Sequence, residues 1–212
     1  MEPGLPFIHI DPLFVVVDKP AGLLAVPGRG PDKQDCVAAR VRARFPDCLD
    51  QPAVHRLDMA TSGLMLLALN QEAHRDLSRQ FAARLVEKRY IAILDGSIAA
   101  EAGEINLAFR LDPDNRPYQI YDPERGKPGI TRWRRISLDQ GRTRVEFIPL
   151  TGRTHQLRVH AAHPLGLNCP IVGDPLYGHG NAGERLLLHA AWLRFRHPGC
   201  GRVMEFTAAP PF

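Results

Sequence analysis

The feature that most constrains the fold of this chain is an apolar run followed directly by a helix signal. Gly63–Leu69 (GLMLLAL) has the length and composition of a buried strand. Asn70 is a good N-cap for a helix over Gln71–Leu85. Apolar residues recur in that helix at four-residue spacing: Ala73, Leu77, Phe81 and Leu85. The pattern predicts a helix that packs one face on a sheet.

Further β-type runs are distributed along the chain. They are Leu13–Asp18, Val86–Leu94, Leu186–Phe195 and Val203–Phe206. Ile130–Ser137 and Thr143–Ile148 flank Asp139-Gln140-Gly141 and predict a β-hairpin. Helices are expected from a cap at Asp35 to about Phe45 and over Thr154–Ala162. This order of elements favours an α+β fold with a largely antiparallel mixed central sheet, flanked by helices and loops.

Length and charge suggest partners without fixing them. The 212 residues suit one large domain or two small lobes. The net charge of +4 comes from 23 Arg and 4 Lys against 23 acidic residues. Arginine binds phosphate bidentately and stacks on bases, which suits RNA, although a GC-rich genome explains the bias equally well. The hairpin arginines fit either a phosphate-tracking ribbon or a wet sheet face; they are Arg132, Arg134, Arg135, Arg142 and Arg144.

Cysteine usage and hydropathy point to a reduced, aqueous setting. The four cysteines lie far apart without a C-x-x-C pair, which argues against a zinc ribbon or a redox motif. The N-terminal Met1–Asp11 has no apolar segment of the kind found in signal peptides. The run Leu64–Leu69 is too short to span a bilayer. We therefore expect a cytoplasmic protein with no membrane partner.

Val54–Gly63 (VHRLDMATSG) is the first stretch that can carry chemistry. In an extended segment, Arg56 and Asp58 share one side and His55 and Leu57 the other. A tight turn over Thr61–Gly63 would hold Asp58 at the end of the strand, where substrate can reach it. We interpret Asp58 as a catalytic carboxylate, while a surface Arg–Asp pair before a turn is the alternative.

Pro149–Gly178 is the second such stretch. It supplies Arg153 and Arg158, and a nearby cation lowers the pKa of a catalytic carboxylate. It also holds His155, His160 and His163, which raise the alternative of a metal-dependent hydrolase. Their spacing of 5 and 3 differs from the i, i+4 zincin pattern, and we expect no metal.

Taken together, these motifs resemble those of the RluA-type pseudouridine synthases. H-R-L-D-M-A-T-S-G resembles the family signature, and the other matching segments follow in the family's order. They are K-P-A-G-L (19–23), E-K-R-Y-I-A-I-L-D-G (87–96), T-G-R-T-H-Q-L-R-V-H (151–160), P-I-V-G-D-P-L-Y-G (170–178) and L-L-L-H-A (186–190). The resemblance runs from about residue 13 to the C-terminus and implies the pseudouridine synthase fold.

The resemblance also implies a reaction and roles for its residues. Uridine in RNA is isomerised to pseudouridine without cofactor or metal. By motif position, Asp58 catalyses cleavage of the glycosidic bond, Arg158 pairs with Asp58, and Tyr90 stacks on the uracil. Arg56 enters the RNA stack in place of the flipped nucleotide. The other candidate substrate-binding residues are His55, Thr61, Leu157 and Ile171.

Finer features narrow the resemblance to the RluA branch. Met59-Ala60, the segment V-P-G-R and the short chain are similar to that branch, which lacks the S4 domain of several relatives. We accordingly expect one catalytic domain over residues 1–212, acting as a monomer. The branch implies stem-loop substrates in RNA: uridine 32 of the tRNA anticodon loop and uridine 746 of 23S rRNA. A non-catalytic RNA-binding module of the same fold is the alternative.

Overall fold

The computed structural model describes residues 4–181 and 183–212, and the backbone forms two compact units. Unit 1 comprises Met1–Lys88 and His189–Pro211, and unit 2 comprises Arg89–Leu188 with Phe212. The sequence-based prediction for the N-terminal segment falls partly on residues 1–3, outside the described residues. Within the described part, no helix is long and apolar enough to cross a membrane.

Unit 1 is built on a sheet with the order β1-β2-β3-β9, and β10 also pairs with β9. All its pairings are antiparallel except the parallel contact between β3 and β9. The strands are β1 (Phe7–Ile10), β2 (Phe14–Lys19), β3 (Ser62–Ala68), β9 (Leu188–Arg196) and β10 (Val203–Thr207). The β2 and β3 strands are almost fully buried, as their continuous apolar runs predict.

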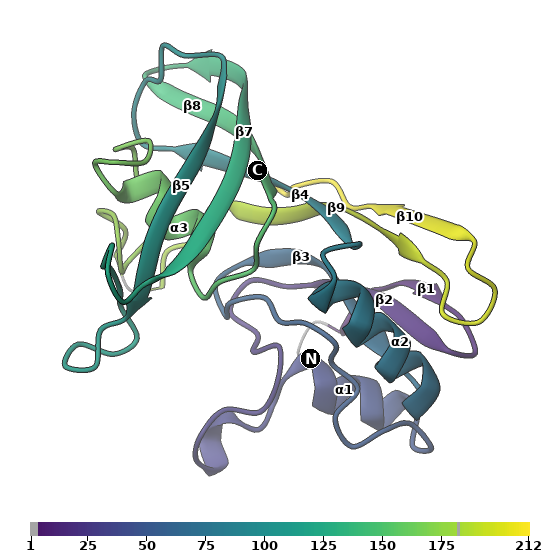
Figure 1. The fold of residues 1–212 in the computed structure, drawn as a ribbon. Coiled ribbons are helices and arrows are strands. Elements are labelled where there is room, and N and C mark those ends of the chain that lie inside the picture. Colours follow the sequence, from purple (N-terminus) through teal and green to yellow (C-terminus); the bar gives the residue numbers. More distant parts are fainter. Residues whose placement is uncertain (1–3, 182) are drawn as a thin grey trace. The chain divides into compact units, whose positions relative to one another are not determined.

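The helices of unit 1 are α1 (Val37–Arg44) and α2 (Gln71–Ala82), with a short 3-10 helix at Pro31–Lys33 (Figure 1). The predicted cap of α2 is confirmed, because Asn70 Oδ1 accepts a hydrogen bond from the Ala73 nitrogen at 2.9 Å. Ala73 and Leu77 of α2 pack with β2, β3 and β9 in one core.

Two helix boundaries differ from the prediction. The α1 cap is Cys36, whose sulfur accepts from the Ala39 nitrogen, whereas Asp35 pairs with Arg40. The α2 helix ends at Ala82, and Arg84 takes a left-handed φ of 59°, so Leu85 is exposed outside the helix. A non-glycine residue in this conformation gives no clear stop signal in the sequence.

Unit 2 has a fully antiparallel sheet with the order β4-β8-β7-β5-β6. Its strands are β4 (Glu87–Leu94), β5 (Ala102–Leu111), β6 (Gln119–Tyr121), β7 (Lys127–Asp139) and β8 (Arg142–Pro149). The predicted hairpin is confirmed as β7–β8, with Gln140 and Gly141 at positive φ in its two-residue turn. The β4 strand carries the chain from unit 1 into unit 2, and β9 carries it back.

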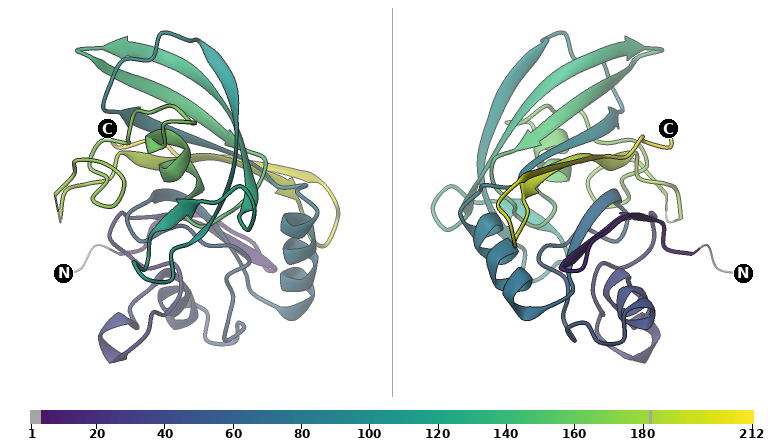
Figure 2. Two further views of the ribbon diagram at one scale, coloured as in Figure 1. Left: turned by 60° about the vertical axis from the view of Figure 1, so that its left-hand side comes forward. Right: turned by 90° about the vertical axis from the view of Figure 1, so that its right-hand side faces the viewer.

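The remaining helix, α3 (Gln156–Ala162), packs beside the long strands of unit 2 (Figure 2). Gln156 fixes its first turn, because its side-chain nitrogen donates to the Ile130 oxygen and to Thr131 Oγ1 on β7. His155 precedes the helix in a left-handed conformation with φ 56°. The helix begins two residues later than predicted.

Pro52–Asp58 is not a regular strand, contrary to the extended segment predicted. It is tied to β3 by an isolated bridge between Ala53 and Leu67 and by a hydrogen bond from the Ala68 nitrogen to the Pro52 oxygen. Leu57 is buried and Arg56 exposed, whereas His55 and Asp58 are both half-buried. Overall, the elements confirm the predicted α+β class with largely antiparallel pairing.

Candidate active site

Asp58 lies at the start of a turn that two backbone hydrogen bonds and a buried lysine hold in place. The Thr61 nitrogen donates to the Asp58 oxygen at 3.1 Å, so the turn covers residues 58–61, three residues earlier than predicted. Lys19 Nζ donates to the Met59 oxygen at 2.9 Å, and the Gly22 nitrogen donates to the same oxygen. The K-P-A-G-L segment therefore supports the loop that carries Asp58.

Lys19 is a functional candidate that the sequence analysis missed. Its side chain is 0% exposed, and Nζ also donates to the oxygens of Pro20 and Leu23. Burial lowers the pKa of Lys19 to about 8, and the negative charge of Asp58 acts in the opposite direction. At neutral pH the ammonium remains mostly protonated, so a buried positive charge acts on the Asp58 carboxylate. The lysine of the motif was the available signal.

Arg56 is an exposed charged side chain of the signature. It is exposed, and no hydrogen bond or ion pair holds it among the described residues of unit 1. A guanidinium that is not engaged within the protein can contact a polyanion or stack on a base. This placement suits the predicted insertion of Arg56 into RNA.

His55 and Thr61, whose predicted role in substrate binding stays a prediction, also make contacts that support the loop. His55 Nε2 accepts from the Leu66 nitrogen at 2.9 Å, and its ring stacks on Phe81 of α2 with centroids 4.6 Å apart. Burial, with a smaller effect from Lys88, lowers the pKa of His55 to about 3, so this ring is neutral. Thr61 is 3% exposed. Both residues fix the Asp58 loop to its own unit.

The end of the signature is joined to the start of β9. Ser62 Oγ lies 2.9 Å from His189 Nδ1, and both side chains are buried. Gly63 has a φ of 113°, and a Cβ there would lie 2.5 Å from the Ala190 nitrogen. Only glycine permits this close approach of backbones. The L-L-L-H-A segment thus supports the Asp58 loop through β3.

The unit 2 candidates lie on β4, on α3 and after α3. Tyr90 is half-buried on β4, opposite Phe147 of β8. Leu157 and Ile171 are buried, and Ile171 forms an isolated bridge with Leu94. Arg158 is buried on α3 at 4% exposure. The predicted pairing of Arg158 with Asp58 and the substrate contacts of Tyr90, Leu157 and Ile171 stay predictions.

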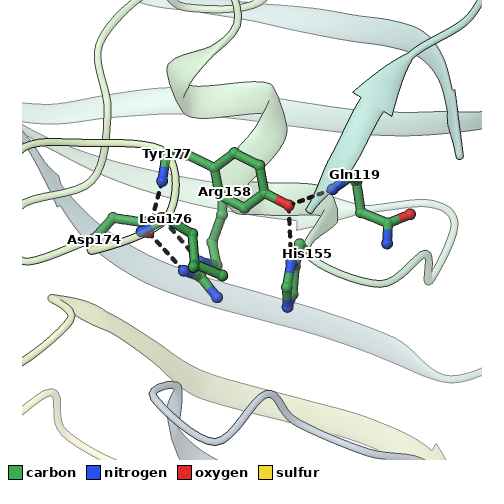
Figure 3. A network of polar contacts seen from close by, with 6 residues as sticks. All are labelled: Gln119, His155, Arg158, Asp174, Leu176 and Tyr177. Carbon is green, nitrogen blue, oxygen red and sulfur yellow. Dashed lines mark hydrogen bonds and ion pairs between the residues drawn. The ribbon is translucent and has the colours of Figure 1, made fainter. Parts of the chain in front are cut away.

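Arg158 is held by a partner that the sequence analysis missed. Its Nε and Nη2 donate to Asp174 Oδ2 and Oδ1 at 2.8 and 2.6 Å (Figure 3). Burial raises the pKa of Asp174, but the hydrogen bonds and charge of Arg158 and the amides of Leu176 and Tyr177 outweigh it and hold the pKa below its usual range. The Asp of P-I-V-G-D-P was visible in the motif, but its distance along the chain from Arg158 gave no pairing.

The three histidines of the metal alternative point to different neighbours. His155 Nδ1 lies 2.9 Å from the Tyr177 hydroxyl, His160 packs edge-on against Phe109, and the His163 ring is tilted against Tyr121. Burial lowers the pKa of His160 to about 4, with His163 adding to the shift. Over the described residues, no group of three or more His, Cys, Asp or Glu side chains is placed to hold a metal ion.

The hairpin arginines all contact acidic side chains or backbone oxygens of unit 2. Their partners are as follows: Arg132 binds Glu104, Arg134 binds Glu146 through two nitrogens, Arg135 donates to the Ile98 oxygen, Arg142 lies 3.9 Å from Asp95, and Arg144 donates to the Phe212 oxygen. These contacts favour the interpretation of a solvated sheet face over a phosphate-tracking ribbon.

The α+β fold and the ordered motifs define an enzyme class. The chain belongs to the RNA pseudouridylate synthase family, whose sequence pattern matches residues 13–163. It is a pseudouridine synthase, an isomerase that modifies RNA.

Individual relatives narrow the class. The chain is 44% identical over 215 residues to the dual-specificity RNA pseudouridine synthase RluA of Pasteurella multocida, with 100% of this chain and 95% of the relative covered. It is 41% identical to RluA of Escherichia coli K12 at the same coverage. These similarities confirm the predicted resemblance to the RluA branch.

Comparison with solved structures gives the same fold. Human RNA pseudouridylate synthase domain containing 1 matches with a TM-score of 0.78 and 31% identity, covering 100% of this chain and 87% of the human chain. Human RNA pseudouridylate synthase domain containing 4 matches with a TM-score of 0.75 at 24% identity, covering 97% and 88%. The pseudouridine synthase fold that the motifs implied is thereby confirmed.

Proposed function

We propose that this enzyme modifies two RNAs, uridine 32 of the tRNA anticodon loop and uridine 746 of 23S rRNA. The proposal is supported by full-length similarity to relatives named as dual-specificity enzymes. The observation that carries the chemistry is the loop of Asp58, which is placed over the buried ammonium of Lys19 with the exposed Arg56 two residues earlier. A cytoplasmic setting, a monomeric state and independence from cofactor and metal stay predictions.

The reaction is an isomerisation that balances without a co-reactant. The bond between N1 of the uracil and C1′ of the ribose breaks, the uracil turns, and a bond forms between C5 and C1′. The proton on C5 leaves to solvent, and N1 gains one. Asp58 catalyses cleavage of the first bond, with the buried ammonium of Lys19 bound to its loop and Arg158 as its proposed cationic partner.

The target uridine must leave the RNA stack before its glycosidic bond can be reached. Extrusion of a base costs a few kcal/mol. Stacking of the uracil on Tyr90 offsets about 1–3 kcal/mol of that cost. Arg56 fills the place that the base leaves, since a planar guanidinium stacks on neighbouring bases. Its exposure and the absence of a partner among the described residues leave it able to do so.

Asp58→Asn tests the catalytic role. We expect tritium release from RNA carrying C5-labelled uridine to fall by roughly 10³-fold or more, because the amide can act neither as a base nor as a nucleophile. RNA affinity, measured by filter binding, should stay within about twofold of wild type. The matched control is Asp47→Asn at an exposed acid of the same unit, which should leave both values unchanged. Full activity of Asp58→Asn would remove Asp58 from the mechanism.

The dual specificity is tested separately. Purified enzyme is incubated with a tRNA and with the 23S rRNA stem-loop, and pseudouridine is mapped in each. Product at both positions is the expected result. Product in only one RNA would restrict the enzyme to a single substrate while leaving its chemistry intact.

A further inference from the structure

We propose that Asp174 is a positioning residue for Arg158, and that it sets the orientation in which the Arg158 guanidinium acts during isomerisation. The inference rests on the proposed catalytic function of Arg158. It assigns a role to the acidic residue of P-I-V-G-D-P-L-Y-G that acts through another side chain and has no direct part in the chemistry.

The contact between the two side chains fixes the plane of the guanidinium. Nε and Nη2 of Arg158 donate to the two oxygens of Asp174 at 2.8 and 2.6 Å. Parallel bonds of this kind fix direction as well as distance. Nη1 takes no part in this pair, so the carboxylate determines where Nη1 points. Arg158 and Asp174 are 4% and 0% exposed, which makes the pair inaccessible to competing water.

Asp174 is itself held by the backbone. Its Oδ1 accepts from the Leu176 nitrogen at 2.9 Å and from the Tyr177 nitrogen at 3.1 Å, as Figure 3 shows. The Asp174 nitrogen donates to the Ile171 oxygen at 3.1 Å. A carboxylate tied to the turn that follows it cannot swing with the arginine, so it acts as a fixed reference point.

The Tyr177 ring makes a second contact with the Arg158 guanidinium. The Arg158 Cζ lies 5.3 Å from the centroid of the Tyr177 ring, within the range of a cation–π contact. The Tyr177 hydroxyl accepts from the Gln119 nitrogen at 2.8 Å and lies 2.9 Å from His155 Nδ1 (Figure 3). The ring is thus fixed to β6 and to the residue before α3. The guanidinium has a carboxylate on one edge and a fixed ring nearby.

Charge gives a second reason for the pair. An isolated guanidinium loses hydration when it is buried, and the adjacent carboxylate offsets this cost. The depressed pKa of Asp174 keeps the carboxylate ionised at neutral pH. Asp174→Asn would leave Arg158 buried with one acceptor oxygen and an opposed amide donor, so the guanidinium would turn away from its native plane.

The test is a double-mutant cycle on the rate of pseudouridine formation. We expect Asp174→Asn to lower kcat by roughly 10- to 100-fold, as a small displacement of a catalytic group does, with KM and RNA affinity within about twofold of wild type. Arg158→Lys cannot form the bidentate pair. Adding Asp174→Asn to Arg158→Lys should therefore lower kcat by less than about twofold more, because the residue through which Asp174 acts has already been changed.

The control is Asp122→Asn in the same unit. Asp122 accepts from Arg110 Nε at 2.6 Å and from the amides of Glu124 and Arg125, which makes it similar to Asp174 in chemistry. It lies outside the proposed machinery, so this variant should lower Tm without changing kcat. Tyr177→Phe is the milder second variant if Asp174→Asn folds poorly. It removes only the hydroxyl, and we expect a loss of roughly threefold to tenfold in kcat.

The outcomes separate the inference from the proposed function. Multiplicative effects of Asp174→Asn and Arg158→Lys, or an unchanged kcat in a folded Asp174→Asn or Tyr177→Phe protein, overturn the positioning role while wild-type activity upholds the function. A loss of activity equal to the fraction of unfolded protein also overturns it. Absence of product from wild type on both RNAs overturns the function and, with it, the inference.

Discussion

At the scale of single residues, side chains of the signature make structural contacts that the motif itself does not indicate. His55 illustrates this, because it lies within the predicted extended segment, next to Arg56, and turns its ring to Phe81 and the Leu66 nitrogen. A motif indicates which residues occur together, yet it does not separate those that face substrate from those that hold the loop. Lys19 and Asp174 were missed for the same reason: one acts on backbone oxygens and the other on a side chain 16 residues away.

His55 makes stability depend on pH in a defined window. Its folded pKa of about 3 lies below the ordinary value of 6.5, so the unfolded chain binds more protons between these limits. The contribution of neutral His55 to the free energy of unfolding is complete above pH 6.5. It is lost as the pH falls toward 3, by up to about 1.4 kcal/mol per pH unit. His160, with a folded pKa of about 4, acts in the same direction. His55→Gln should flatten the slope of unfolding free energy against pH in urea titrations.

His55→Phe separates titration from hydrogen bonding. It removes the same proton site, so it should flatten the slope equally. It also leaves the Leu66 nitrogen without its acceptor, which should cost about 1–3 kcal/mol at pH 7. An unchanged slope in both variants would show that His55 does not titrate between the folded and unfolded states.

At the scale of elements, the sequence predicted individual strands, a helix cap and a hairpin better than the connecting segments and the long-range strand pairing. The β3 strand, the Asn70 cap and the β7–β8 hairpin follow from apolar runs, a capping side chain and a two-residue turn. The extended segment before Asp58 was wrong because contacts to β3 shape it more than its own residues do. The parallel contact of β3 with β9 had no local signal, since its partner lies far along the chain.

That contact gives a sharp prediction for Gly63→Ala. The new Cβ would meet the Ala190 backbone, which cannot move aside, and φ is positive. We expect the free energy of unfolding to fall by about 3 kcal/mol or more. Gly201→Ala is the matched control, because φ is also positive but nothing lies within 4 Å; its cost should be about 1–2 kcal/mol. Equal losses in urea unfolding would contradict the steric argument.

At the scale of the whole molecule, the number of arginines overestimates the positive charge that is available to bind RNA. The net charge is +4, and several hairpin arginines already bind acids or backbone oxygens of unit 2. The arginine-rich composition therefore carried less information about RNA than the position of Arg56 within the signature. The family motifs identified the chemistry, whereas the roles of individual arginines required their contacts.

Removing one hairpin pair tests this reading of the charge. Arg132→Gln combined with Glu104→Gln keeps the net charge and deletes one ion pair. We expect RNA affinity within about twofold of wild type and an unchanged slope of log affinity against log salt. A phosphate contact by Arg132 would instead lower that slope by about 0.7–0.9. Arg56→Gln serves as the contrasting variant and should lower turnover.

Unit 1 is formed by two chain segments that unit 2 separates in the sequence, and this order affects how the protein folds during synthesis. Ala190 follows its β3 partner Gly63 by about 130 residues, so a ribosome needs roughly 6–25 s to deliver β9 after β3 has been synthesised. During that interval Ser62 and Gly63 at the start of β3 lack their β9 partners, and unpaired strand backbone can pair with other nascent chains. The catalytic loop is thus completed only near the end of translation, and chaperone demand should concentrate in the period before residues 189–211 emerge.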